Sequence, residues 1–128
     1  MITDTLDAFV LQYIETALWS STDDDGTPLD GAYSIDDVAP EAIEAMQADC
    51  IRFQLENAEL IKNALANDPG LDLTDIAHDF WLTRNHHGAG FWDGDYAPES
   101  LGEALTEASH AFGEAYLYIG DDGQIYVA

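Results

Sequence analysis

Residues 72–95 read DLTDIAHDFWLTRNHHGAGFWDGD. Apolar residues at helical spacing come first, a glycine turn follows His87, and the aromatic pair Phe91-Trp92 comes next. This pattern predicts a helix over residues 74–85, with Asp72 as its candidate N-cap and a turn behind it. We expect the fold to be organised around this stretch, with residues 86–93 holding a C-terminal hairpin against the helices.

Three more helices are predicted outside this stretch. Apolar residues recur at helical spacing over residues 3–19 and, from Pro40, over residues 40–65, while Pro98 opens a helix that stops at Gly113. The closing segments EAYLYI and QIYVA alternate around GDDG at residues 120–123, which is typical of a β-hairpin. Phe91-Trp92 is a candidate third strand. The expectation is one α+β domain over residues 1–128, with about four helices packed on a small antiparallel sheet.

The charge is the most unusual property of the chain. It holds 26 acidic and 3 basic residues, a net charge of −23, and no Lys or Arg occurs in residues 1–50. Such a chain repels nucleic acid and anionic membranes and attracts basic surfaces. No apolar run is long enough for a membrane span, no signal peptide is recognisable, and the single cysteine allows no internal disulfide. A cytoplasmic setting is expected.

Motifs for metal binding and catalysis are incomplete. The candidate metal ligands are His78, Asp79, His86, His87, Asp93 and Asp95, but their spacing matches no zinc pattern. The acidic loop around Gly26 lacks the acids that an EF-hand needs at its first and twelfth positions. Cys50 lies on an apolar helix face, and no G-x-S-x-G motif occurs. We therefore predict no catalytic residue, metal or cofactor, and a structural role for Arg84 in an ion pair or a stack on Trp81 or Trp92.

Rows of carboxylates are the candidate binding residues. Glu99, Glu103 and Glu107 follow one another at every fourth position, so they share one helix face. Neighbouring side chains on such a face lie about 5–6 Å apart, close to the spacing of phosphates along a nucleic-acid strand. Asp49 is expected near the row on the second helix. The predicted partner-binding acids are Glu41, Glu44, Glu56, Glu59, Glu99, Glu103, Glu107, Asp23, Asp24 and Asp25.

A resemblance is carried by FWLTRNHHGAGFWDGDY at residues 80–96, the helix after it, and the closing EAYLYIGDDGQIYV. This part of the chain, residues 71–127, is similar to small acidic proteins of bacteriophages and mobile elements. Their block reads LTRN-G-HGAGFWD, with glycine where this chain has His86. The resemblance lends no catalytic residues. It implies a protein similar in type to the DNA-mimic inhibitors of restriction and CRISPR systems.

The functional expectation is a non-enzymatic DNA mimic, anti-CRISPR or anti-restriction in type. Its partner would be a basic nucleic-acid-binding complex of a host defence system, with no direct contact to nucleic acid or membrane. One alternative is adaptation to high salt, which also selects acid-rich sequences and says nothing about activity. Another is a small cation-binding or adaptor protein. The sequence also leaves a homodimer open.

Overall fold

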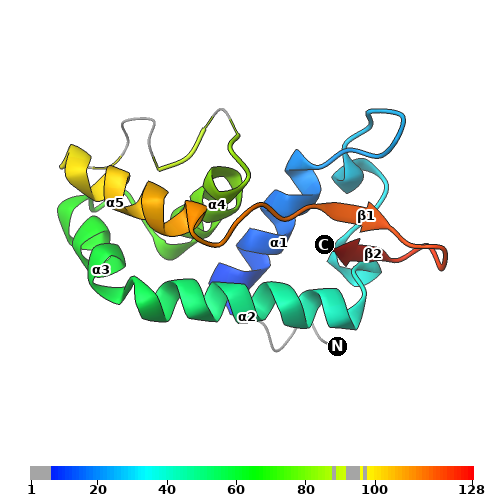
Figure 1. Cartoon of the computed structure of the whole chain (residues 1–128), viewed down its shortest axis with the longest axis horizontal. Coiled ribbons are helices and arrows are strands. Elements are labelled where there is room, and N and C mark those ends of the chain that lie inside the picture. The colour runs from blue at the N-terminus through cyan, green and yellow to red at the C-terminus, as the bar shows by residue number, and fades with distance from the viewer. Residues whose placement is uncertain (1–6, 88, 92–95, 97) are drawn as a thin grey trace.

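The computed structural model describes residues 7–87, 89–91, 96 and 98–128 (Figure 1). Within them the chain forms five α-helices and one β-hairpin, which confirms the predicted α+β class. The α-helices are α1 (Ala8–Ser20), α2 (Pro40–Glu56), α3 (Ala58–Asn67), α4 (Leu73–Arg84) and α5 (Glu99–His110). The 3-10 helices are η2 (Leu29–Gly31) and η3 (Ile35–Asp37), and the strands are β1 (Leu117–Ile119) and β2 (Ile125–Val127).

Helix α1 begins later than its apolar pattern predicts. Asp7 is extended and its carboxylate accepts the amide of Val10 at 2.9 Å, so Asp7 is the N-cap and lies outside the first turn. An N-cap carboxylate satisfies an amide that has no partner within the helix. The predicted start at Thr3 is therefore wrong at Asp7, and Asp4 lies outside the described residues.

The helix predicted over residues 40–65 is two helices. It breaks at Asn57, whose backbone amide and side-chain amide both donate to the carbonyl of Phe53, at 3.1 and 3.0 Å. A side chain that competes for a helix carbonyl favours a helix end. The chain turns at this point, and α3 leaves the line of α2 (Figure 1). The prediction of one long helix was wrong, while its start at Pro40 is confirmed.

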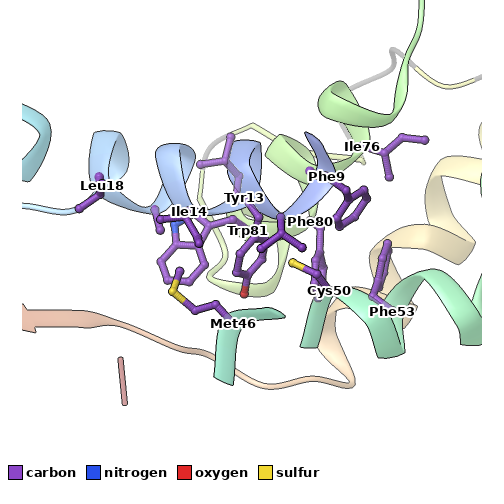
Figure 2. Packing of buried hydrophobic residues seen from close by; sticks show 14 of the residues in the cluster. Phe9, Tyr13, Ile14, Leu18, Met46, Cys50, Phe53, Ile76, Phe80 and Trp81 are labelled. Carbon is purple, nitrogen blue, oxygen red and sulfur yellow. The ribbon is translucent and has the colours of Figure 1, made fainter. Parts of the chain in front are cut away.

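The core forms where α1 packs against α4 and α2 closes over both (Figures 1 and 2). Tyr13 of α1 lies 5.3 Å, between ring centroids, from both Phe80 and Trp81 of α4. Phe53 of α2 stacks on Phe80 at 4.0 Å. Offset and edge-on aromatic contacts of this kind add stability beyond the buried area itself. Leu73, predicted on the apolar side of α4, is instead 40% exposed at its first residue.

The C-terminal hairpin is confirmed. β1 and β2 are antiparallel, with Leu117 opposite Val127 and Ile119 opposite Ile125. Val38 forms a parallel bridge to Ile125, which joins the hairpin to the segment before α2. The predicted third strand does not start at Phe91, which is buried within a turn, and Trp92 lies outside the described residues. No helix in the described ranges is long and apolar enough to cross a membrane.

Candidate acidic interaction surface

Helix α5 presents its acidic row to solvent. Glu99, Glu103 and Glu107 are all exposed, while Leu101 and Leu105 on the opposite side are buried. No Lys, Arg or His of the described residues forms an ion pair with the three glutamates. The row is therefore a line of uncompensated negative charge, one carboxylate per helical turn.

A glycine fixes the orientation of α5. A Cβ atom at Gly102 would lie 2.6 Å from the carbonyl oxygen of Phe91, closer than real Cβ contacts come. The absence of a side chain therefore lets α5 lie directly on the turn after α4. Because this face of α5 is in contact with backbone, the face that carries the glutamate row has to point outward.

The acids of α2 and α3 do not form the continuous row that the sequence predicts. Glu41, Glu44, Glu56 and Glu59 are exposed, but the break at Asn57 separates the first three from Glu59. Glu56 also pairs with Arg52, whose Nε lies 3.0 Å from its carboxylate. These acids add to the general negative charge but are a weaker candidate than the α5 row.

Asp49 was expected near the same face, and the structure places it elsewhere. Its carboxylate lies 2.8 Å from Nη1 of Arg84, a side chain only 5% exposed. Arg84 also donates to the hydroxyl of Tyr13 and to the carbonyls of Phe112 and Gly113, at 2.9, 3.1 and 2.9 Å. Asp49 therefore neutralises a buried cation and is not available to a partner.

The environment of Arg84 confirms the predicted structural role. Its guanidinium carbon lies 5.7 Å from the ring centre of Phe80 and 5.6 Å from that of Phe112, so the stacking partners are phenylalanines where tryptophans were predicted. Burial lowers the pKa of Arg84, but Tyr13 and Asp49 outweigh burial and hold that pKa above its ordinary value. Burial raises the pKa of Tyr13 far above its ordinary value. The cluster therefore holds one permanent cation beside a neutral phenol.

The acidic loop before η2 is a tight turn. Asp23 accepts the backbone amides of Asp25 and Thr27, at 2.9 and 3.0 Å, so its carboxylate serves the turn. Asp24 and Asp25 are exposed. Together the three aspartates line one wall of a hollow of about 500 Å³, and β1 forms the opposite wall.

The histidines do not form a metal site with the acids near them in sequence. His78 lies 2.8 Å from the hydroxyl of Thr16, and burial lowers its pKa. His86 lies beside His110, with 4.3 Å between ring centroids, and 4.0 Å from the carboxylate of Glu114. Within the described residues no group of three His, Cys, Asp or Glu side chains is placed to hold a metal ion. Asp93 and Asp95 lie outside those residues, and Asp79 accepts the hydroxyl of Tyr96 at 2.7 Å.

The sequence interpretation missed a tyrosine surface on the hairpin. Tyr118 and Tyr126 stack across the two strands with 5.7 Å between ring centroids, and Tyr116 lies 6.2 Å from Tyr118. The hydroxyl of Tyr126 donates to Asp122 at 2.6 Å, and this bond raises the pKa of Tyr126 to about 12. The signal was present, because alternation in EAYLYI and QIYVA puts all three tyrosines on one face.

Cys50 is fully buried in the core, as predicted, and burial raises the pKa of its thiol well above the ordinary value. A thiol kept neutral in an apolar environment is a poor nucleophile. The chain matches no protein-family model, no curated protein and no solved structure.

Proposed function

We propose that the protein is a non-enzymatic inhibitor that mimics nucleic acid and occupies a basic, nucleic-acid-binding surface of a host defence complex. The observation that carries the proposal is the uncompensated row Glu99, Glu103 and Glu107 on α5. A helix held rigidly by its buried face presents these charges at a fixed spacing, and proteins that bind nucleic acid aim Lys and Arg at phosphates with a comparable spacing.

The distribution of the basic residues supports this proposal. Arg84 is buried and Arg52 pairs with Glu56, so two of the three cations are already committed within the fold. The net charge of −23 therefore acts almost entirely outward. Like charges along one helix face cost stability in the free protein. A basic partner removes that cost on binding, which is the physical reason for a complex.

The test is a pull-down with the purified protein as bait in a nuclease-treated bacterial lysate at about 100 mM salt. At this ionic strength charges are screened beyond roughly 10 Å, so close charge matching is needed for retention. We expect retention of one nucleic-acid-binding complex, and its release both by added duplex DNA and by a salt step. Release by DNA distinguishes competition for a shared surface from binding elsewhere on the complex.

A matched pair of variants assigns the surface. The triple variant Glu99→Gln, Glu103→Gln, Glu107→Gln lowers the net charge to −20, because three negative charges are removed from −23. The control Glu15→Gln, Asp30→Asn, Asp36→Asn removes the same number of charges from other exposed positions. We expect the first variant to lose the complex and the control to retain it. Equal retention by both variants, or no DNA-releasable complex with the original protein, contradicts the proposal.

A further inference from the structure

One edge of the hairpin is open. Tyr116 and Ala128 exchange both backbone hydrogen bonds, at 3.1 and 2.9 Å, and the amide of Gly120 donates to Gln124 at 2.8 Å. Because bonding alternates along an antiparallel pair, Leu117 and Ile119 must turn their amides and carbonyls away from β2. No backbone partner from the described part of the chain meets them there. β1 is therefore an unpaired edge strand.

The other edge of the hairpin is closed. The carbonyl of Ile125 in β2 accepts the amide of Ala39 at 2.8 Å, next to the parallel bridge with Val38. The open edge also ends the sheet on the side where the loop before η2 lies (Figure 1). Proteins commonly cover or charge such an edge, because it is a template for another strand. Here it borders the hollow of about 500 Å³ described above.

The side chains around this edge are suited to cations. Asp23, Asp24 and Asp25 form the wall that faces β1 across the hollow. Tyr116 and Tyr118 are 64% and 44% exposed on the outer face of the hairpin. Tyrosine faces attract Arg and Lys side chains, and carboxylates pair with them. A strand added to β1 would place alternate side chains beside these tyrosines, since neighbours across strands lie within contact distance.

We propose that the β1 edge binds an extended, Lys- or Arg-rich peptide segment, which adds as a further strand between β1 and the Asp23–Asp25 loop. Backbone pairing with Leu117 and Ile119 supplies the register, and the acids and tyrosines select the basic side chains. A second copy of this chain is the poorer occupant, because two bodies of charge −23 repel one another. This site lies at the opposite end of the molecule from α5, so its test is independent of the function proposed above (Figure 1).

The probe is a capped heptapeptide of alternating lysine and valine, titrated by NMR into the full-length protein at about 50 mM salt. We expect one peptide per protein, shifted amide signals at Leu117 and Ile119, and slower hydrogen exchange at both. A peptide with glutamate in place of lysine should not bind. Binding of the two peptides with equal affinity would overturn the charge selection.

Methylated peptides test the backbone pairing. One version carries N-methyl groups on the valines and another carries them on the lysines, with the charge unchanged. Alternate residues of an added strand face β1, so only one of the two versions loses the amides that pair. We expect that version to bind at least about tenfold more weakly, since it loses several hydrogen bonds, and the other to bind normally. Equal affinities of both versions would overturn strand addition and leave general charge attraction.

A protein variant complements the peptides. Ile119→Pro removes an amide that has no partner in the hairpin, and proline is tolerated on an edge strand for that reason. The control Ile119→Ala shortens the same side chain but keeps the amide. We expect only the proline variant to lose the peptide, with both variants folded by circular dichroism.

Two other occupants of the edge would refute the proposal. A concentration-dependent dimer in sedimentation experiments that Ile119→Pro abolishes would assign the edge to a second copy. Binding of an oligonucleotide at Leu117 and Ile119 in preference to the lysine peptide would assign it to nucleic acid.

Discussion

Arg84→Met tests the interpretation of the core directly. Methionine keeps the aliphatic part of the side chain but removes four hydrogen bonds, to Asp49, Tyr13, Phe112 and Gly113. The Tyr13 hydroxyl is left without its donor in a side chain 1% exposed. Asp49 fares better, because its side chain is 37% exposed and can be hydrated.

Breaking a buried ion pair by removing one partner costs about 3–5 kcal/mol. We expect this loss in the free energy of unfolding. For 128 residues the entropy of unfolding is about 0.27 kcal/mol per kelvin, so the melting temperature should fall by about 11–18 °C. The stacking on Phe80 and Phe112 is included in this range, because methionine also packs favourably against aromatic rings.

Urea denaturation followed by circular dichroism measures the loss, provided that the m-value is unchanged. The control is Arg52→Met, the same replacement at an exposed arginine whose ion pair with Glu56 spans one helical turn. Arg52 also lies 4.4 Å from the ring centre of Phe112, so the control should lose about 0.5–1.5 kcal/mol. A loss of under about 1 kcal/mol for Arg84→Met, or one no larger than the control's, would refute the reasoning.

Three further outcomes are expected. Gly90→Ala should destabilise by about 2 kcal/mol or more in urea titrations, because its φ is +152° and the new Cβ would meet a hydroxyl at 2.2 Å, whereas Gly31→Ala meets nothing within 4 Å and should be neutral or better. Stability should be complete below pH 9 and fall above it, by up to about 1.4 kcal/mol per pH unit for each group, because burial raises the pKa values of Cys50 and Tyr13 and the folded state therefore favours their neutral forms. Tyr13→Phe should reduce that slope above pH 10, in urea titrations between pH 8 and 11. Glu103→Gln should stabilise by about 0.4–1 kcal/mol at low salt by relieving two like-charge pairs, a gain that thermal melts in 1 M salt should no longer show.

Several elements follow from local chemistry alone. Asp72 is the N-cap of α4 and its carboxylate accepts the amides of Thr74 and Asp75, as its position before an apolar run predicts. The cap, the proline before α5 and the glycines of the hairpin act through bonds to near neighbours. Such signals survive in a sequence because they need no distant partner.

The helix break shows where local reasoning fails. Asn57 ends α2, yet Asn63 lies within α3 and the helix continues through it. Both are the same residue type in a helical pattern. The difference arises after Asn57, where the buried Ile61 and Ala64 have to reach the core from a helix that runs in a new direction. A choice that depends on what each segment packs against is not encoded in the local periodicity.

The acidic site divides in the same way. The spacing of Glu99, Glu103 and Glu107 determines that they share a face, and the net charge determines what kind of partner is attracted. Only the fold decides that Asp49 is withdrawn to pair with Arg84, 35 residues away in sequence. It likewise decides that β1 keeps an open edge beside the Asp23–Asp25 loop. Periodicity and charge act within a few residues or over the whole surface, whereas pairing between distant segments exists only once the core has brought them together.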